Sequence, residues 1–166
     1  TGKTVSKDEA HKKGIIHRVV HVWIINYRNE VLLQKRDKTS RIFPSYWDIS
    51  VAGHVSAGQS SLEAARQEAK DELGLDINLS EFKLISILQA NLVFNNGNYL
   101  DNEFQDVYFV KKDLDIDQIK LNDGEVEAAK FISLDEFGLW VSGKGEPMVP
   151  HEEEYKLLLK YIHDLT

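Results

Sequence analysis

The sequence predicts an α/β fold in which helices cover both faces of a mixed β-sheet, forming an α/β/α sandwich. Three features indicate this class. Residues 15–25 (IIHRVVHVWII) are rich in β-branched side chains, which is typical of a strand buried on both faces. Residues 60–73 combine helical periodicity with capping residues at both ends. Further strand-like and helical segments then alternate along the chain, which favours a sheet covered by helices.

The composition is that of a single globular domain. A chain of 166 residues can bury a sizeable core, and its 42% hydrophobic and 28% charged residues are ordinary for a folded protein. We therefore expect one domain over residues 1–166, with the polar segment 1–13 at its periphery. Because the chain begins with Thr1 and not with Met, we also expect native residues to precede it. Nothing in the sequence excludes a homo-oligomer.

Charge, cysteine content and hydropathy exclude several classes of function. No apolar run is long enough to span a membrane, and the first residues do not resemble a signal peptide. The absence of cysteine excludes disulfides and thiolate zinc sites, and it favours a cytoplasmic location. The formal net charge of −7 argues against non-specific binding to nucleic acid. A phosphorylated small molecule remains compatible, because cations can bridge carboxylates to phosphate.

The remaining elements are predicted from β-branched runs, turn residues and capping patterns. Turns are expected at residues 26–29 and 95–98, and each joins two antiparallel strands. The other strands are expected at residues 31–36, 47–52, 82–94, 99–110 and 125–132. A short helix should begin after Ser133, which has Glu136 three residues later, and a final amphipathic helix should cover about residues 151–165.

The helix at residues 60–73 presents three different faces. Ser60 and Glu63 form a capping box at its start, and Gly74 should end it in a left-handed conformation. At about 100° per residue, the apolar stripe that should face the core consists of Leu62, Ala65, Ala69 and Leu73. The polar stripe that should face water consists of Glu63, Gln67 and Lys70. The third face is acidic and consists of Glu68, Asp71 and Glu72.

Three carboxylates at positions i, i+3 and i+4 of this helix indicate a cation site. Like charges at this spacing repel each other by a few tenths of a kcal/mol per pair, so the cluster is unfavourable without a counter-charge. Oxygen ligands of this kind bind hard divalent cations such as Mg²⁺, often together with substrate phosphates. A solvated acidic face is the alternative interpretation, and the surrounding loop and cap favour the cation site.

The stretch 53–75 (GHVSAGQSSLEAARQEAKDELGL) resembles a Nudix box, whose pattern is G-x5-E-x7-R-E-U-x-E-E-x-G-U with U aliphatic. The residues that match are Gly53, Glu68, Asp71, Glu72, Gly74 and Leu75, with aspartate at position 71 as a conservative change. Two glutamines depart from the pattern, since Gln59 replaces its first glutamate and Gln67 its arginine. Both can still form neutral hydrogen bonds. The resemblance implies the Nudix fold, with a metal ion held by Glu68, Asp71, Glu72 and the carbonyl of Gly53.

Beyond the box, the chain is most similar to the Nudix branch that includes isopentenyl-diphosphate isomerases. The matching landmarks are His11, His17 and residues 47–48, 52–54, 101–103 and 121–126. Those isomerases have a catalytic cysteine at the position of Ala52, and a methyl group cannot exchange a proton with an allylic carbon. Isomerase chemistry is therefore not expected. The resemblance also implies a metal site at His17, His54, Asp101 and Glu103, which His11 joins less directly because its spacing is shifted by one residue.

Several further side chains are candidates for substrate contact. A guanidinium group matches two phosphate oxygens, and the basic candidates, each with a solvated surface charge as its alternative, are Arg18, Lys35, Arg36 and Arg41. His17 and His54 either contact metal or substrate or serve as hydrogen-bonded supports. Trp47 either stacks on a base or packs in the core. Glu103 is either a metal ligand or one polar position on an alternating strand, and His21 is expected to be a satisfied core histidine.

These observations together predict a Mg²⁺-dependent hydrolase that cleaves a diphosphate linked to an organic group. Glu68 and Glu72 are the expected catalytic residues of the box, and Glu72 or Glu125 would orient or deprotonate the attacking water. Mn²⁺ is an expected substitute for Mg²⁺, and the expected partner is a small-molecule diphosphate. A non-catalytic ligand-binding domain is the first alternative, because Gln59 and Gln67 break the pattern. An isopentenyl-diphosphate isomerase is the second.

Overall fold

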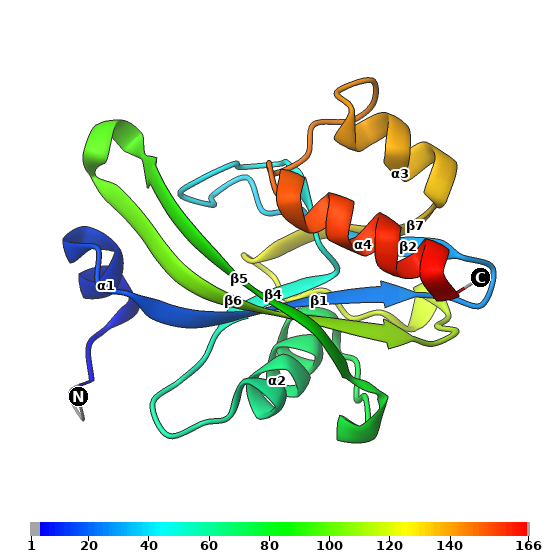
Figure 1. The fold of residues 1–166 in the computed structure, drawn as a ribbon, viewed down its shortest axis with the longest axis horizontal. Coiled ribbons are helices and arrows are strands. Elements are labelled where there is room, and N and C mark those ends of the chain that lie inside the picture. The colour runs from blue at the N-terminus through cyan, green and yellow to red at the C-terminus, as the bar shows by residue number, and fades with distance from the viewer. Residues whose placement is uncertain (1–3, 166) are drawn as a thin grey trace.

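The computed structural model describes residues 4–165, and these form a seven-stranded mixed sheet with helices on both faces (Figure 1). The strands are β1 His17–Ile25, β2 Glu30–Arg36, β3 Trp47–Asp48, β4 Val51–His54, β5 Lys83–Phe94, β6 Tyr99–Lys111 and β7 Val126–Ser133. The α-helices are α1 Lys7–Lys13, α2 Ser61–Leu73, α3 Leu134–Val141 and α4 Glu152–Leu165. The strand order is β3-β2-β1-β6-β5, with β4 also paired to β1 and β7 to β2. The predicted α/β/α sandwich around a mixed sheet is confirmed.

Strand β1 is the centre of the sheet, because it pairs with three strands from different parts of the chain. It runs parallel to β6 over its whole length, starting from the pair His17 and Glu103. It runs antiparallel to β4, where His21 lies opposite Ala52, and it meets β2 at Ile25. Its side chains alternate between two hydrophobic cores, so most of β1 is buried, as predicted.

Helix α2 covers one face of the sheet, below it in Figure 1. The residues of its apolar stripe that are fully buried are Ala65, Ala69 and Leu73. At its start, Ser60 Oγ accepts a hydrogen bond from the Glu63 N–H at 3.3 Å, and the Glu63 carboxylate accepts one from the Ser60 N–H at 2.9 Å. Gly74 ends the helix with a φ of 69°, a conformation that favours glycine. Both predicted caps are confirmed.

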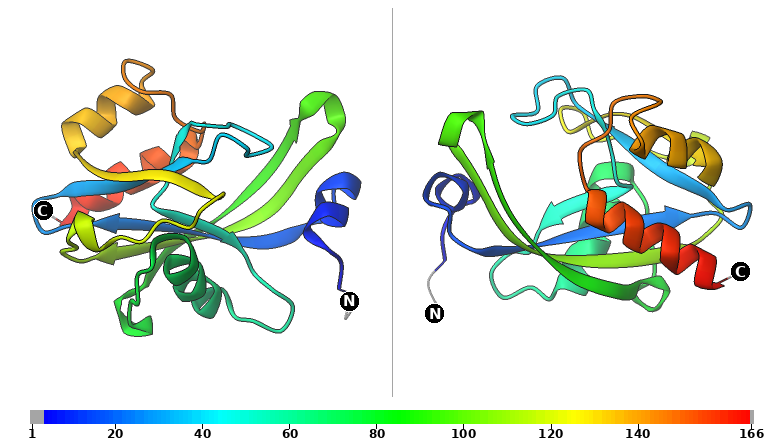
Figure 2. Two further views of the ribbon diagram at one scale, coloured as in Figure 1. Left: turned by 180° about the vertical axis from the view of Figure 1, so that it is seen from behind. Right: turned by 45° about the horizontal axis from the view of Figure 1, so that its top comes forward.

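Helices α3 and α4 cover the opposite face, as Figure 2 shows. The core beneath them is built around Trp23 of β1, whose ring meets Phe137 and Tyr155 edge to face at centroid distances of 5.6 and 5.9 Å. Leu158 of α4 is fully buried in the same cluster. This layer fixes the start of α4 against β1.

Residues 47–52 contribute to two short strands instead of the single predicted strand. Strand β3 pairs with β2, whereas β4 pairs with β1. Between them, Ser50 Oγ accepts a hydrogen bond from the Ile24 N–H at 2.9 Å and donates one to the Leu32 carbonyl at 2.6 Å. The buried hydroxyl bridges β1 and β2 at the point where the chain passes from one ladder to the other. One continuous strand cannot pair in both places.

The amino-terminal segment contains a helix that the sequence analysis does not anticipate. Helix α1 is capped by Ser6 at its start and by Gly14 at its end. It buries Ala10 and His11 and packs against β6. Part of the segment expected at the periphery is therefore packed against the sheet, while residues 1–3 lie outside the described residues.

Replacing the capping serine of α2 should lower the free energy of unfolding by a small amount. Ser60→Ala removes the side-chain acceptor of the Glu63 N–H, and losses of this kind cost about 1 kcal/mol. Urea unfolding followed by circular dichroism should show this decrease in the free energy of unfolding. Ser80→Ala is the matched control, because Ser80 is exposed and lies outside α2. An equal loss in both variants would contradict the assignment.

Candidate active site and metal ligands

Two carboxylates of α2 lie beside strand β4. Glu72 is 8% exposed, and its Oε2 accepts hydrogen bonds from Gln34 Nε2 at 3.1 Å and from the Ala52 N–H at 3.2 Å. Glu68 is half-buried against the backbone of Gly53. A Cβ atom at position 53 would come within 2.1 Å of Glu68 Cδ, so only glycine allows this approach. The opening glycine of the box and its glutamates therefore form one packed unit.

The position of these carboxyl groups raises their pKa values. Burial and the charges of Asp71 and Glu125 raise the pKa of Glu68 to about 7. Burial raises the pKa of Glu72 to about 8, and the charges of Glu68 and Glu125 add to this effect against the opposing hydrogen bond from Ala52. The carboxylates thus repel one another where water is partly excluded. A divalent cation between them would relieve this repulsion.

Asp71, the third acidic residue of the box, is exposed. Both of its carboxylate oxygens accept hydrogen bonds from Gln67 Nε2 at 2.8 Å. Gln59 Oε1 accepts a hydrogen bond from the Ser56 N–H at 3.2 Å. The two glutamines that depart from the box pattern therefore form neutral hydrogen bonds. Within residues 4–165, no group of three or more metal-ligating side chains gathered within 4.8 Å includes Glu68, Asp71 or Glu72.

A cleft of about 590 Å³ opens over Glu68 and Glu72. The predicted site residues that line it are Arg36, Arg41, Gly53, His54, Glu68, Glu72 and Glu125. Asn122 holds Glu125 in place by donating a side-chain hydrogen bond to its Oε2 at 3.0 Å. The sequence does not single out Lys7, Gln34 and Tyr99, which also line the cleft. Of these, only Gln34 carries a signal, because a polar residue directly after an apolar strand run should be buried with a partner.

A second group of metal-ligating side chains lies where α1, β1, β4 and β6 meet. Its members, whose ligand atoms lie within 4.8 Å of one another, are His11, His17, His54 and Glu103. His11 Nε2 is 3.1 Å from His54 Nε2, and His17 Nε2 is 3.3 Å from Glu103 Oε1. Asp101 lies beside the group, with its Oδ1 3.3 Å from His11 Nδ1. The structure thus brings together all five residues of the metal site that the isomerase branch implies.

The donor atoms of this histidine cluster fit a bound cation. His11 Nδ1 and His17 Nε2 are buried and form no well-aligned hydrogen bond within the described residues, although carboxylate oxygens of Asp101 and Glu103 lie 3.3 Å away. Burial lowers the pKa of His54 to about 3, with a further contribution from Lys7, so its imidazole is neutral and can act as a ligand. A mixed set of imidazole and carboxylate ligands suits a transition metal better than Mg²⁺.

Three predicted substrate-contact residues lie away from the cleft. Arg18 forms an ion pair with Asp106. Lys35 Nζ lies 3.4 Å from a carboxylate oxygen of Glu127. Trp47 is 7% exposed and packs in the core beneath α3, which agrees with its alternative interpretation. None of the three lines the cleft.

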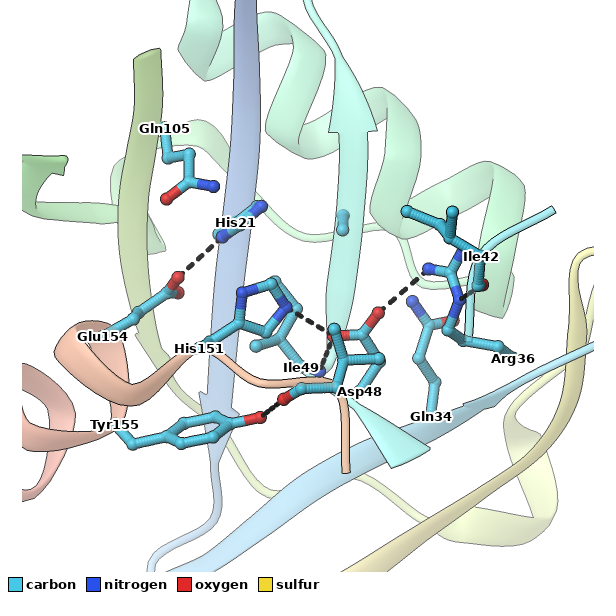
Figure 3. A network of polar contacts seen from close by, with 12 residues as sticks. His21, Gln34, Arg36, Ile42, Asp48, Ile49, Gln105, His151, Glu154 and Tyr155 are labelled. Carbon is cyan, nitrogen blue, oxygen red and sulfur yellow. Dashed lines mark hydrogen bonds and ion pairs between the residues drawn. The ribbon is translucent and has the colours of Figure 1, made fainter. Parts of the chain in front are cut away.

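A network of charged side chains connects β1, β2, β3 and the start of α4 (Figure 3). Arg36 Nη1 donates a hydrogen bond to Asp48 Oδ2 at 3.0 Å, and His151 Nε2 lies 3.1 Å from Asp48 Oδ1. His21 Nδ1 lies 2.7 Å from Glu154 Oε2. The histidine that the sequence places in the core is therefore satisfied by a buried carboxylate.

The charges of this network compensate one another. Burial of the His21 imidazole acts against its charged form, but the adjacent Glu154 carboxylate raises its pKa to about 9. Burial of Asp48 acts against ionisation, but His151 and Arg36 lower its pKa to about 2. At neutral pH the His21 imidazole is therefore protonated and the Asp48 carboxylate is ionised.

Comparison with known proteins identifies the family. The family model of the NUDIX domain matches residues 15–153, which is most of the chain. The chain belongs to the Nudix family. Nudix hydrolase 3 of Arabidopsis thaliana is 36% identical over 155 residues, covering 92% of this chain and 20% of that protein. An uncharacterized Nudix hydrolase of Listeria monocytogenes, lmo0368, is 35% identical over 136 residues, covering 82% of this chain and 75% of that protein.

The relatives also include isomerases, as the resemblance to that Nudix branch implies. Isopentenyl-diphosphate Delta-isomerase of Pectobacterium atrosepticum is 33% identical over 132 residues, covering 80% of this chain and 70% of that protein. The prediction of a Nudix-type hydrolase acting on diphosphate bonds is confirmed at the level of the family. Nudix hydrolases generally use a divalent metal, which agrees with the clustered ligands described above.

Solved Nudix structures confirm the fold. The NUDIX domain of Shewanella oneidensis NrtR, solved in complex with ADP ribose, matches with a TM-score of 0.68 at 12% identity. The match covers 95% of this chain and 99% of that chain. DR0079 of Deinococcus radiodurans matches with a TM-score of 0.66 at 20% identity, covering 84% of this chain and 81% of that chain. At these identities the likeness concerns the fold alone.

The raised pKa of Glu72 should make the stability of this Nudix chain depend on pH when divalent cations are removed. A carboxyl group whose pKa rises from 4.5 on folding stabilises the fold fully below pH 4.5, and this contribution is lost as the pH rises through about 8. Glu72→Gln removes the titrating group. Urea unfolding in EDTA should therefore show a loss of stability between about pH 5 and pH 9 that is smaller in the variant by about 1–3 kcal/mol. Glu127→Gln, at an exposed residue of β7 outside the cleft, should keep the wild-type dependence. An unchanged dependence in Glu72→Gln would refute the assignment.

Proposed function

We propose that this Nudix chain is a Mg²⁺-dependent pyrophosphohydrolase that cleaves the diphosphate linkage of a nucleoside or other organic diphosphate. The observation that carries the proposal is the pair Glu68 and Glu72, which line the cleft with raised pKa values. The ionised forms of two such carboxyl groups are poorly stabilised by the protein alone. The pair therefore favours binding of a divalent cation. A cation held there can also bind the oxygens of a diphosphate.

The chain offers a set of oxygen ligands for Mg²⁺ at this position. The proposed Mg²⁺ ligands are Glu68, Glu72, Asp71 and the carbonyl of Gly53, whereas Glu103, the proposed metal ligand outside the box, belongs to the histidine cluster. Mg²⁺, or Mn²⁺ in its place, would neutralise charge on the phosphate oxygens and lower the pKa of a bound water. Because its imidazoles favour a transition metal, we assign the histidine cluster to a separate cation.

The proposed catalytic residues are placed to act on a water molecule and on phosphate. Both donors to Glu72, Gln34 Nε2 and the Ala52 N–H, bind its Oε2, which leaves Oε1 for a water or a cation. Glu125 lines the same cleft and is the second candidate for orienting or deprotonating the water. Among the basic residues, those that line the cleft and would meet phosphate are Lys7, Arg36 and Arg41.

Glu72→Gln should reduce turnover by at least about 100-fold, because the variant keeps the hydrogen-bonding geometry but loses the charge. Phosphate release should be measured with Mg²⁺ across nucleoside diphosphates, dinucleotides, sugar nucleotides and prenyl diphosphates. Glu127→Gln is the matched control, since Glu127 lies on β7 outside the cleft, and it should retain wild-type turnover. Absence of turnover across the panel, with tight binding of one ligand, would instead favour a non-catalytic ligand-binding domain.

Isopentenyl diphosphate should not be isomerised by this chain. Ala52, opposite His21 in the sheet, has a methyl group that cannot donate or accept a proton. Labelled isopentenyl diphosphate followed by NMR should therefore show no dimethylallyl diphosphate, while the related isomerase of Pectobacterium atrosepticum serves as the positive control. Formation of the allylic isomer at a comparable rate would reject the proposal.

We also propose a cytoplasmic location and no non-specific binding to nucleic acid, on the basis of the cysteine-free, acidic sequence. The proposed partner is a small-molecule diphosphate, and a homo-oligomer stays a prediction. Among residues 4–165, no helix has the length and apolar character needed to cross a membrane.

A further inference from the structure

A second pocket, of about 150 Å³, lies beside the cleft and has one polar and one aromatic wall. We propose that this pocket holds the organic group of the substrate, and that this group is small and hydroxylated, with the size and polarity of a pentose. The proposal rests on the proposed function for the position of the diphosphate. It adds the chemical class of the group that the diphosphate carries.

The pocket adjoins the cleft along strand β4. Residues that line both are Lys7, Arg36, Ile42, Ala52, Gly53, His54 and Tyr99. Glu68 and Glu72 lie on the cleft side of this boundary, whereas His21 and His151 lie on the pocket side. A diphosphate bound over the two glutamates would therefore direct its organic group across β4 into the pocket.

The volume of the pocket limits the size of its occupant. Pockets that enclose a drug-sized ligand occupy roughly 300–1,000 Å³. A five-carbon group fits the volume of this pocket, whereas a nucleoside, which adds a base to its sugar, would extend beyond it.

The polar wall offers hydrogen bonds that the protein itself leaves open. His21 uses Nδ1 for Glu154, and its second ring nitrogen points away from that carboxylate in Figure 3. Gln105 Nε2 donates a hydrogen bond to Glu103 Oε2 at 3.4 Å, so the side-chain carbonyl oxygen of Gln105 remains available as an acceptor. Both residues line the pocket. A hydroxyl group suits these positions, because it can donate to the Gln105 oxygen and can pair with His21 in either protonation state.

A hydrocarbon group could pack against the aliphatic residues of the lining, such as Val19, Ile42 and Val149, but it is a poor occupant beside His21 and Gln105. It would displace water from the polar wall without replacing its hydrogen bonds, and each buried polar group left unpaired costs about 1–3 kcal/mol. The charges in this wall already compensate one another, since His21 pairs with Glu154 and Asp48 with both Arg36 and His151. Asp101 and Glu103, which also line the pocket, lie 3.3 Å from nitrogens of His11 and His17, and Lys7 lines both the pocket and the cleft, where it can meet the diphosphate. The interior of the pocket therefore favours polarity over further charge. A neutral hydroxylated group meets both conditions.

The aromatic residues of the lining suit the carbon face of a sugar ring. Phe94 meets Phe43 edge to face at a centroid distance of 5.4 Å, and Tyr99 lies 6.3 Å from Phe94. All three rings line the pocket. A furanose can place its C–H bonds against these rings while its hydroxyl groups face His21 and Gln105.

Binding of two matched ligands tests the proposal. Ribose 5-diphosphate and isopentenyl diphosphate both carry five carbons, and only the first is hydroxylated. Their methylene-bridged analogues cannot be hydrolysed at the bridge, so calorimetry with Mg²⁺ measures affinity independently of turnover. The ribose analogue should bind at least about tenfold more tightly than the isopentenyl analogue. Equal affinities, tighter binding of the isopentenyl analogue, or no binding of either would overturn the proposal.

A pair of variants then locates the preference in this pocket. Gln105→Met keeps the length of the side chain but removes its acceptor. It should therefore weaken binding of the ribose analogue by about tenfold and leave the affinity for the isopentenyl analogue unchanged. Gln89→Met is the matched control, because Gln89 is an exposed residue of β5 outside the pocket, and it should change neither affinity. An equal effect of Gln105→Met on both analogues would show a structural role only and would overturn the assignment. The proposed hydrolysis is tested separately, by the turnover panel. Because the binding measurements do not depend on turnover, a failure of hydrolysis can be told apart from a failure of this proposal.

Discussion

The close contact between the backbone of Gly53 and the side chain of Glu68 is the constraint on which the site depends. Strand β4 is held by β1, and the small residues Ala65 and Ala69 let α2 pack close to the sheet. Glu72 can therefore reach the Ala52 N–H at 3.2 Å. A side chain at position 53 would overlap Glu68 and force the helix or its carboxylate away from the cleft. Packing thus determines where the negative charge gathers.

Local signals account for the parts of the fold that the sequence predicts well. Helix α2 has its start and end marked by side chains within a few residues, at Ser60 and Gly74. The division of residues 47–52 depends instead on Ser50, whose hydroxyl bonds two strands that are distant in sequence. Helix α1 has only seven residues, too few for a clear period, so the capping residues Ser6 and Gly14 were the available signals.

Some predicted site residues lie in the cleft and others do not, for a similar reason. The spacing of the box identifies Glu68 and Glu72, but a helical pattern alone does not distinguish the buried Glu72 from the exposed Asp71. On β2, the side chains of Gln34 and Arg36 reach the cleft and that of Lys35 does not, because successive side chains of a strand point to opposite faces. The sequence shows two adjacent basic residues, Lys35 and Arg36. Only the pairing of the strand decides which of them reaches the cleft.

The charges on the two sides of β4 explain why one region suits a cation and the other a neutral group. On the cleft side, burial and neighbouring carboxylates raise the pKa values of Glu68 and Glu72, and the proposed metal would supply the missing positive charge. On the pocket side, Glu154 and Asp48 already have protein cations beside them. A substrate that lies across β4 should therefore carry its charge at one end only. A diphosphate joined to an uncharged polar group has this distribution, because the metal needs its phosphates and the compensated pocket has no use for a second charge.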